Sequence, residues 1–582
     1  MKIHFISRIS TAILSVLVVT LFTNCKSDTA KIGNTSTADK AVVSKTVWGA
    51  YGGDQSNQRY STLDQINVSN AKDLKLAWEQ SLNHDEAQEC TPIIADGTLF
   101  VTTASGPKFV HAFDAKTGAV KWSTAFTIAP DVARFACCGI VNRGASYANG
   151  KLYVGRLDGK LTCLNAADGK EVWSVDVVDY KQGSVITSPP LIVGNKVITG
   201  HGGGEYGSTS YLSAYDAGTG AQLWKTLTVP GADAKVAASW KGDSWKTGGA
   251  APWFIGSYDP ELKTVYWGTS NPSPWNATMR GTDDEKYGEK TNLYSASTLA
   301  LNPDDGTIKW HYQTTPFDAW DYDGVNECVL ADLDIAGTKT PVLMKADRNG
   351  FFYTLNRSTG KLISAEAFVK VNWAKSIDVA TGMPVEDPKY RLTAKNSVKA
   401  VYPSFMGGKN WQPMSFNPGT GLVYIPANNV GMDFKAAKVN YQRGYFFLGS
   451  EWVMQYEDGV SAGEYVAWDP INKKKVWSIP QKFPTPGGTM TTAGNLVFFG
   501  NLEGTFNAVD AKTGASVWST KTNSGVSAAP MTYEVDGKQY VAIVEGRPTV
   551  IPGFVGGKMG EDMVKATPAG GKISVFALNG GK

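Results

Sequence analysis

The sequence predicts an all-β fold, an eight-bladed β-propeller with tryptophan-docking repeats. Three observations predict it: a phrase that recurs along the chain, an alternating apolar strand before each copy, and the lack of a long amphipathic helical pattern. The chain has 582 residues, of which 62 are glycine and 18 are tryptophan, as is typical of many short strands joined by turns. Because blades that close in a circle protect their edges, one such domain can use the whole length.

Each copy of the phrase begins with Asp or Asn, passes through small or polar residues to a Gly, and usually ends at a Trp. The clear copies are DAKTGAVKW (114–122), NAADGKEVW (165–173), DAGTGAQLW (216–224), NPDDGTIKW (302–310) and DAKTGASVW (510–518), and the weaker ones are NRSTGKLIS (356–364), NPGTGLVYI (417–425) and DPINKKKVW (469–477). The Asp or Asn caps the backbone and the Gly accepts a positive φ, so the phrase forms a tight turn. The Trp then begins the next strand and can pack between neighbouring sheets. Most copies start about 40 to 60 residues apart, and eight copies suggest eight blades, with the two chain ends sharing the closure.

The N-terminus predicts export. Lys2 and Arg8 flank the start of the apolar run ISTAILSVLVVTLF, which is too short for a secure membrane span, so residues 1–24 are predicted to be a signal peptide. Cys25 stands where a bacterial lipoprotein is cleaved and acylated, although the two residues before it are larger or more polar than usual. Residues 25–45 form a polar tether, and residues 46–582 the propeller. We therefore expect a periplasmic protein, either soluble or anchored to a bacterial membrane by a lipid at Cys25.

Composition argues against several functions. The formal charge is +3, from 56 basic and 53 acidic residues, so no nucleic-acid partner is expected. The 5 histidines are scattered, which argues against a histidine-rich zinc site. No strand–Gly-x-Gly-x-x-Gly–helix unit is visible, which argues against a nicotinamide enzyme, and no Cys-x-x-Cys-His sequence marks a c-type haem.

Two cysteines, Cys137 and Cys138, are adjacent in FACCGIVNRGASY (135–147). Consecutive Cα atoms lie ~3.8 Å apart, whereas ordinary disulfides span roughly 4.4–6.8 Å, so a bond between neighbours closes a strained ring. The stretch alone leaves both options open, two reduced cysteines or a strained disulfide, and export to an oxidising compartment favours the disulfide. Cys90, Cys163 and Cys328 are expected to be small buried residues.

Seven segments outside the recurring phrase carry a family resemblance. They are WGAYGGDQSNQRYSTLDQIN (48–67), CCGIVNRG (137–144), YDPELKTVYWGTSNPSPWN (258–276), WHYQTTPFDAWDYDGVNE (310–327), DRNGFFYTLNR (347–357), GGKNWQPMSFNP (407–418) and TPGGTMTTAGNLVFFG (485–500). In this order, over roughly residues 46–578, they resemble the quinoprotein alcohol dehydrogenases, eight-bladed periplasmic enzymes that use pyrroloquinoline quinone (PQQ). The resemblance implies oxidation of a small primary alcohol to an aldehyde. It also implies transfer of electrons to a separate soluble or membrane cytochrome c.

The resemblance implies a site for PQQ, a flat ortho-quinone with three carboxylates. The Cys137–Cys138 ring would cover one face of the quinone and Trp253 would support the other. Arg143 would pair with a carboxylate and Arg348 would lie near the quinone oxygens. Further implied cofactor contacts are Glu89, Thr187, Ser188, Gly203, Gly204, Asn410 and Trp411. Gly202 stands where the family often has Ser, a departure that affects one hydrogen bond to the cofactor. The alternatives are blade packing for Trp253, and turn or core roles for Ser188, Asn410 and Trp411.

The resemblance also implies a metal ion held by Glu205, Asn271 and Asp321, all hard oxygen donors suited to calcium-like ions. Asp323 lies two residues after Asp321, and in an extended stretch both carboxylates point to the same side. Calcium-using members usually carry a small uncharged residue there, whereas Asp resembles the lanthanide-dependent members. A trivalent ion favours a further anionic oxygen, and without one two close carboxylates repel. We therefore expect a lanthanide, with calcium as the alternative for the ion, and with a lysine pair or a turn cap as the alternative for Asp323.

In the implied mechanism the ion acts as a Lewis acid and Asp321 is the general base that takes the alcohol proton. One rival is a non-enzymatic β-propeller lipoprotein that scaffolds an envelope assembly, which shares the repeats but needs none of these site residues. Another is a membrane-bound quinoprotein sugar dehydrogenase, which brings several N-terminal spans. Segment 428–449 resembles the ethanol-type members, but the sequence does not choose among methanol, ethanol and larger primary alcohols. A homo-oligomer is expected, although no sequence feature specifies the number of subunits.

Overall fold

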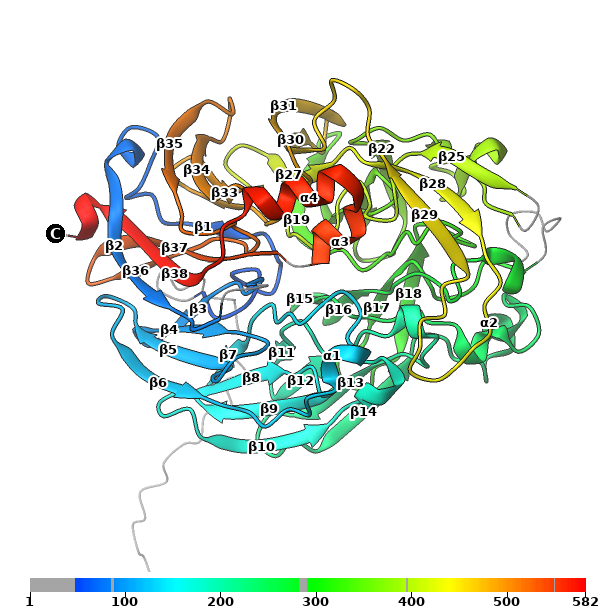
Figure 1. The fold of residues 1–582 in the computed structure, drawn as a ribbon, viewed down its shortest axis with the longest axis horizontal. Helices are drawn as coiled ribbons and strands as arrows, with labels where there is room; N and C mark the ends of the chain where they lie inside the picture. The colour runs from blue at the N-terminus through cyan, green and yellow to red at the C-terminus, as the bar shows by residue number, and fades with distance from the viewer. Residues whose placement is uncertain (1–47, 85–87, 282–289, 394–395, 549, 582) are drawn as a thin grey trace, which may run out of the picture. The chain divides into compact units, whose positions relative to one another are not determined.

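Antiparallel sheets follow one another along the chain in the computed structural model, which describes residues 48–84, 88–281, 290–393, 396–548 and 550–581 (Figure 1). Within these residues, seven sheets have four strands and one has five. Five of them are made of consecutive strands: β3 (Ile93–Ala95), β4 (Thr98–Thr102), β5 (Val110–Asp114) and β6 (Val120–Thr124); β7 (Ser146–Ala148), β8 (Lys151–Gly155), β9 (Lys160–Asn165) and β10 (Glu171–Asp176); β11 (Leu191–Val193), β12 (Lys196–Thr199), β13 (Tyr211–Asp216) and β14 (Gln222–Leu227); β15 (Ser257–Asp259), β16 (Thr264–Gly268), β17 (Ser297–Leu301) and β18 (Ile308–Gln313); β19 (Val329–Ile335), β20 (Thr338–Ala346), β21 (Phe351–Asn356) and β22 (Leu362–Ala367).

The remaining sheets include strands from distant parts of the chain. They are β26 (Ser415–Asn417), β27 (Leu422–Asn428), β30 (Gly463–Asp469) and β31 (Lys474–Gln481); β1 (Tyr60–Ser61) with β32 (Met490–Thr492), β33 (Leu496–Gly500), β34 (Thr505–Asp510) and β35 (Ser516–Lys521); β36 (Met531–Val535), β37 (Lys538–Gly546), β38 (Gly571–Leu578) and β2 (Leu74–Ser81); and the small sheets β23 (Ala374–Ile377) with β24 (Pro384–Glu386), and β25 (Ser397–Val401), β28 (Gly431–Ala436) and β29 (Ser450–Gln455). The mostly-β architecture predicted from the sequence is confirmed.

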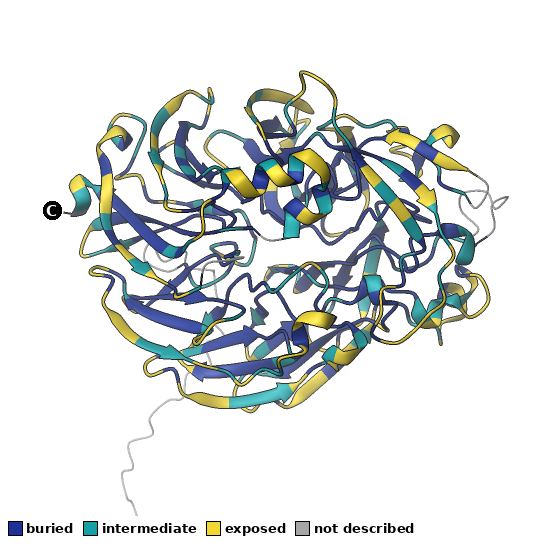
Figure 2. Ribbon diagram, viewed as in Figure 1, coloured by how far each residue is buried: buried dark blue, intermediate teal, exposed yellow. Residues whose placement is uncertain are grey.

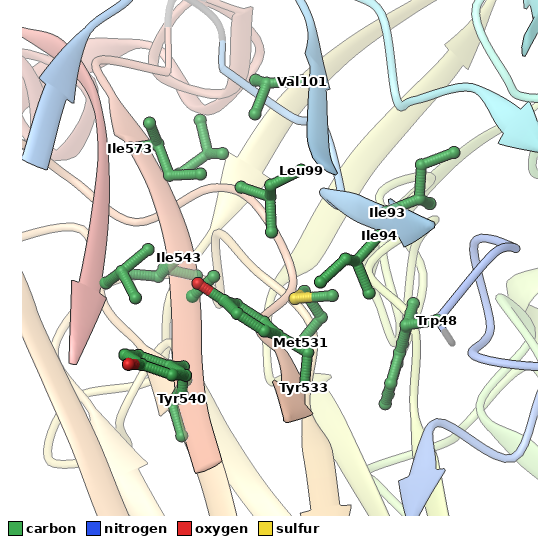
Figure 3. Packing of buried hydrophobic residues seen from close by; sticks show 14 of the residues in the cluster. Trp48, Ile93, Ile94, Leu99, Val101, Met531, Tyr533, Tyr540, Ile543 and Ile573 are labelled. Carbon is green, nitrogen blue, oxygen red and sulfur yellow. The ribbon is translucent and has the colours of Figure 1, made fainter. Parts of the chain in front are cut away.

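The two ends of the propeller region share one sheet, as predicted. Strand β2 pairs antiparallel with β38 and takes the outer position that a sheet's fourth strand has elsewhere. Figure 3 shows the core behind this closure, where Trp48 and Leu99 from the N-terminal part pack near Met531 and Ile543 from the C-terminal part. Burial of these apolar side chains stabilises the closure by roughly 25 cal/mol per Å². In Figure 2 the inner strands of the sheets are mostly dark blue and therefore buried, whereas the outer strands carry the yellow, exposed residues.

Most of the recurring turns receive a tryptophan from an earlier strand, usually the Trp that ends the preceding copy. In the first copy Asp114 Oδ1 accepts hydrogen bonds from the Lys116 and Thr117 amides, and the Gly has a φ of +73°. The Trp122 ring lies so close to Gly169 that a Cβ there would come within 2.4 Å of it. The same docking joins Trp78 to Gly118, Trp173 to Gly220, Trp224 to Gly306, Trp310 to Gly360 and Trp477 to Gly514. The tryptophan-docking repeats are therefore confirmed.

Two copies of the repeat, at 417–425 and 469–477, follow a phrase that does not end in Trp. Among the described residues, no atom lies within 4 Å of the Cβ position at Gly421. The preceding copy, NRSTGKLIS, ends at Ser364 where the others have Trp, so no indole reaches this turn. In DPINKKKVW the Gly position is taken by Lys473, which adopts a φ of +56°.

Residues 48–61, here called the hub segment, contact the first strand of one sheet after another. Its backbone carbonyls accept from Ile94 in β3, Tyr147 in β7, Tyr258 in β15, Leu330 in β19, Phe416 in β26 and Thr491 in β32. The Gln55 side chain reaches Ile192 O in β11, and Arg59 reaches Pro530 O just before β36. The contacts follow chain order. Because a short segment cannot reach far, the first strands of these sheets are gathered around it.

Besides short 3-10 turns, four short α-helices lie between strands in the described residues, and the sequence pattern did not indicate them. They are α1 (Val132–Phe135), α2 (Ala234–Ala238), α3 (Val550–Val555) and α4 (Gly557–Ala566). In the part of the chain that the structure describes, no helix is long and apolar enough to cross a membrane. The described residues all belong to one compact unit. The predicted signal peptide (1–24), Cys25 and the tether (25–45) lie outside the described residues.

Candidate active site

One cavity collects most of the predicted site residues. Twelve of them line it, namely Glu89, Cys137, Cys138, Arg143, Thr187, Gly203, Glu205, Trp253, Asp321, Arg348, Asn410 and Trp411. A positional rule explains part of this gathering. Several of these residues lie four positions before the first strand of a sheet: Glu89 before Ile93, Thr187 before Leu191, Trp253 before Ser257 and Trp411 before Ser415. Because the first strands surround the hub segment, the residues that precede them converge.

Arg143 is the centre of the polar half of the cavity. Its guanidinium lies 2.8 Å from the Glu89 carboxylate and donates a 2.7 Å hydrogen bond to Thr187 Oγ1. The guanidinium carbon is also 5.3 Å from the ring centroid of Trp253 and 4.6 Å from that of Trp411. Its Nε atom is buried and has no hydrogen-bond partner among the described residues. Burial raises the pKa of Glu89 and Arg143 opposes this rise. A buried cation with a free donor between two indoles suits a planar anionic ligand.

Arg348 joins the two aspartates of the AWDYDG segment. Its Nη1 lies 3.3 Å from Asp321 Oδ2, and its Nη2 lies 3.0 Å from Asp323 Oδ2. Asp323 is fully buried and also accepts from Trp253 Nε1 at 3.0 Å and from the Asn271 amide at 2.6 Å. The partners of Asp323 are thus an arginine, an indole and an amide, and not a lysine. The backbone of Asp321 has a φ of +65°, an uncommon value for a residue with a side chain and one that is found more often at functional sites.

The acidic groups here exceed the positive charge. Burial, followed by repulsion from Asp323, raises the pKa of Glu205 to about 7. Burial also raises the pKa of Asp321 well above its ordinary value; Asp323 and Glu205 add to the rise, and Arg348 opposes it. Burial raises the pKa of Asp323, again against the effect of Arg348. Three carboxylates that share one guanidinium are costly to bury as ions, so the site favours an additional cation.

The oxygen atoms of this acidic half fit a hard cation. Asn271 Oδ1 and Asp321 Oδ1 are buried, and in the described part of the chain neither has a hydrogen-bond partner. A Cβ on Gly204 would lie 3.1 Å from Asn271 Oδ1, so only glycine leaves space beside this oxygen. Among the described residues, no group of three or more His, Cys, Asp or Glu side chains is placed so that it could hold a metal ion as it stands. The carboxylate and amide oxygens are nevertheless the donors that calcium-like and lanthanide ions prefer.

The expected disulfide between Cys137 and Cys138 is not formed: both are free cysteines in the structure. The neighbouring Cα atoms are closer than an unstrained disulfide allows. The Cys137 thiol instead interacts with Cys138, whose hydrogen bond is the main cause that raises the pKa of Cys137 well above its ordinary value, followed by burial. A thiol held in its protonated form is a poor nucleophile for disulfide formation. Cys90, Cys163 and Cys328 are buried, as predicted.

Four predicted residues lie behind the cavity wall. Ser188 donates its hydroxyl to Trp253 O at 3.0 Å, so it holds the indole-bearing loop. Gly204 leaves space beside Asn271. Asn271 and Asp323 are themselves fully buried, with relative exposures of 0%.

Sequence reasoning missed an apolar part of the cavity. Its lining includes Trp275, Phe405, Trp452, Ile551 and Phe554. These residues come from distant segments, and each one alone reads as an ordinary core residue. Only Trp275 had a sequence signal, because it lies within segment 258–276, the motif that also contains the predicted metal ligand Asn271.

Comparisons with known proteins agree with this geometry. The family described as "PQQ: Glucose/ethanol/alcohol dehydrogenase, beta-propeller domain" matches residues 48–372 and 455–541. Quinoprotein alcohol dehydrogenase PedH of Pseudomonas putida is 41% identical over 545 residues, which cover 90% of this chain and 89% of that protein. Lanthanide-dependent methanol dehydrogenase of Methylacidiphilum fumariolicum is 39% identical and covers 90% of this chain and 91% of its own.

A solved structure described as europium-containing methanol dehydrogenase superposes with a TM-score of 0.88 at 37% identity, covering 92% of this chain and 98% of that chain. These likenesses support an enzyme over the scaffold alternative. The family model matches most of the chain, and the two relatives named above align over about nine tenths of both sequences. This chain therefore belongs to the PQQ-dependent alcohol dehydrogenases.

Proposed function

We propose that this enzyme oxidises a primary alcohol to an aldehyde with PQQ and a lanthanide ion, and that the ion is held by Glu205, Asn271, Asp321 and Asp323. The observation that carries the proposal is a pair of buried oxygens, Asn271 Oδ1 and Asp321 Oδ1, that have no hydrogen-bond partner within the described part of the chain, together with the buried Asp323 carboxylate. Asp323 supports a trivalent ion because it adds a negative charge that a divalent ion does not require. A relative named lanthanide-dependent and a solved structure described as europium-containing support the same choice, and calcium is the alternative.

In this proposal the polar half of the cavity binds the cofactor. The Arg143 guanidinium would pair with a cofactor carboxylate, while Glu89 and Thr187 fix its orientation. Trp253 supports the ring plane, with Ser188 and Asp323 fixing its backbone and its indole nitrogen. Asn410, Trp411, Cys137, Cys138, Gly203 and Gly204 complete the lining and the space around it. When bound, PQQ supplies the acceptor for the hydride of the alcohol carbon.

Asp321 is the proposed general base. Asp321 lines the cavity and its Oδ1 has no hydrogen-bond partner among the described residues, so its carboxylate can accept the hydroxyl proton of the alcohol. Burial raises the pKa of this carboxyl, and the Arg348 guanidinium opposes that rise and favours the ionised form. Arg348 therefore favours the ionised carboxylate of Asp321 and holds its side chain in position.

Several wider features also belong to this proposal. The eight larger sheets correspond to eight blades, an interpretation supported by the hub segment that meets their first strands in chain order. Residues 1–24 direct export to the periplasm, with 25–45 as tether, 46–582 as the dehydrogenase domain and Cys25 as the candidate lipid anchor. A separate cytochrome c accepts the electrons, and a homo-oligomer remains a prediction.

The test is reconstitution of the purified protein with PQQ and either lanthanum or calcium, followed by dye-linked oxidation of ethanol and methanol. We expect cofactor uptake and turnover that depend on lanthanum. If the protein takes up no PQQ with either ion, the assignment of the site is wrong. Turnover with calcium alone would keep the dehydrogenase and overturn the lanthanide.

A further inference from the structure

Two loops carry three of the four proposed ligands of the ion. Residues 271–275, between β16 and β17, contain Asn271, and residues 318–323, between β18 and β19, contain Asp321 and Asp323. Neither loop belongs to a strand, so no sheet fixes the distance between them. The Asn271 amide donates to Asp323 Oδ1 at 2.6 Å, which joins the two loops at one point. The spacing of the ligand oxygens therefore depends on the other contacts between the loops.

Arg280 makes a second connection between these loops. Its Nε donates a 2.6 Å hydrogen bond to Pro274 O, and its Nη2 donates a 3.3 Å hydrogen bond to Trp275 O, both in the first loop. The same Nη2 also donates to Asp318 O in the second loop, and Nη1 donates to Asn292 Oδ1. Because the donors of a guanidinium have a rigid, forked geometry, these bonds fix the distance between the two loops.

The stability of the fold does not explain this arginine. The Arg280 side chain is fully buried, and the four hydrogen-bond acceptors given above are uncharged oxygens. Burial lowers the pKa of Arg280 to about 9, although the charge of Asp318 opposes this effect. A charge buried among neutral groups is costly, and an apolar side chain of similar volume would avoid that cost. The position of Arg280 between the loops is better explained by the site.

Asp318 links Arg280 to the proposed base. Its Oδ1 accepts a hydrogen bond from the Trp320 amide at 2.9 Å, and its Oδ2 accepts one from the Tyr322 amide at 3.0 Å. These two residues flank Asp321, whose φ of +65° is uncommon for a residue with a side chain. One carboxylate thus holds the backbone on both sides of Asp321, while Arg280 holds the carbonyl of the same Asp318.

We infer that Arg280 is a positioning residue for the ion, because its bonds to both loops set the distance between Asn271 and Asp321. The inference rests on the proposed function, since it concerns the ion that this function requires. Loss of the connection would leave every ligand in the chain, but part of the binding free energy would then be used to bring the ligands together. Substitution of residues that orient metal ligands typically lowers metal affinity by roughly 10-fold to 100-fold.

The test is a terbium titration of the full chain, with and without PQQ, followed by tryptophan-sensitised luminescence. Arg280→Lys keeps the charge, but one ammonium cannot contact both loops in the geometry of a guanidinium, so the terbium Kd should rise by roughly 10-fold to 100-fold. Arg280→Gln removes the buried charge and is too short to join both loops, so it should raise the Kd at least as much.

Arg357→Lys is the matched control. Arg357 is also buried, donates to Ala331 O and, at 2.7 Å, to Asp332, and lies outside the cavity lining. This variant should keep the terbium Kd of the wild type, while urea unfolding should show a loss of stability similar to that of Arg280→Lys.

A second measurement distinguishes positioning of the ion from a part in the chemical step. With PQQ and saturating lanthanum, both Arg280 variants should recover most of the wild-type kcat. At limiting lanthanum their activity should fall in proportion to the weaker affinity. A kcat that stays low at saturating lanthanum, with an unchanged terbium Kd, would overturn the inference.

Two further results would overturn the inference and keep the proposed function: a wild-type terbium Kd in both Arg280 variants, or an equal loss of affinity in Arg357→Lys. A wild-type protein that binds neither terbium nor PQQ would overturn the proposed function, and the inference would fall with it. Thermal unfolding identifies a variant that has lost its fold. If Arg280→Lys is such a variant, the comparison of Arg280→Gln with Arg357→Lys decides.

Discussion

The Arg348 guanidinium lies 3.0 Å from the Asp323 carboxylate, and a second nitrogen of the same group lies 3.3 Å from Asp321. One arginine thus holds the proposed base and the residue that would select a trivalent ion. Arg348 is itself buried, so the three groups depend on one another for charge compensation. A substitution of one of these three residues should lower catalytic activity more than it lowers the stability of the sheets.

Replacement of Arg348 by lysine tests this coupling. A single ammonium cannot contact both carboxylates in the forked geometry of a guanidinium, so we expect kcat/KM to fall by roughly a hundredfold or more. Steady-state kinetics of the loaded enzyme measures the effect. Arg443→Lys, at an exposed ion pair with Asp179, is the matched control and should change kcat/KM little. Equal losses in both variants would contradict the coupling.

Metal affinity should depend on pH through Glu205. Its pKa is raised from 4.5 to about 7 in the metal-free protein, so at lower pH the folded protein carries a proton that a coordinating ion must displace. Lanthanide affinity should therefore rise as pH increases through about 7 and then level off. Terbium luminescence sensitised by tryptophan, measured at pH 5.5 and pH 8, reports this affinity. Glu205→Gln should weaken binding and flatten the pH dependence, and a steep dependence in that variant would point to another group.

The same shift predicts the stability of the metal-free protein. Because the folded pKa of Glu205 lies above the unfolded one, the folded state binds the proton more tightly, and its stability should decrease as pH rises from about 4.5 to about 7. Comparison of wild type with Glu205→Gln by denaturant unfolding isolates this contribution from those of other acids.

Two glycines at the same position of the repeat allow a matched test of tryptophan docking. Gly169 has a φ of +72° and would place a Cβ 2.4 Å from the Trp122 ring, whereas Gly421 has a φ of +70° with open space among the described residues. Alanine at either site has the same backbone strain, so Gly169→Ala should be less stable than Gly421→Ala by about 1–3 kcal/mol from overpacking. Urea unfolding measures the difference, and equal losses would show that the docking is not tight.

The hub segment should be sensitive at Arg59. This buried side chain donates to Thr489 O at 2.9 Å, to Pro530 O at 2.7 Å and to Tyr51 O. Arg59→Met removes the donors from three buried carbonyls, and we expect a loss of about 2–5 kcal/mol in unfolding free energy. Thermal and urea unfolding measure it. A loss below about 1 kcal/mol would mean that the hub segment contributes little to closure.

The repeats were predictable because their chemistry is local. The Asp or Asn cap and the Gly set the turn within one phrase, and even the missing indole at Gly421 is legible from Ser364 one copy earlier. The path of the hub segment was not predictable, since its contacts join residues far apart in the chain. Helix α3 was hidden because Pro552 and Gly553 interrupt its short pattern.

The charged half of the site could be predicted through the family resemblance, because its residues stand within recognisable motifs, whereas each metal ligand taken singly could equally have been a turn residue. Their partners could not be predicted: Asp323 was expected beside a metal or a lysine, and the structure adds Trp253 and Arg348. The apolar part of the cavity escaped prediction because its lining residues extend from Trp275 to Phe554 along the chain, and each alone resembles an ordinary core residue. The pairing of Cys137 with Cys138 was wrong because export favours oxidation in general but does not fix the state of one strained pair.

The most direct test of the account is the metal preference of Asp323→Ala. Dye-linked alcohol oxidation by PQQ-loaded enzyme is measured with lanthanum and with calcium, for wild type and variant, after confirming that both bind PQQ. The account predicts that wild type depends on lanthanum and that the variant loses lanthanum activity by roughly a hundredfold while its activity with calcium persists or rises. A variant with wild-type lanthanum activity would contradict the assignment of Asp323 as a ligand of the ion.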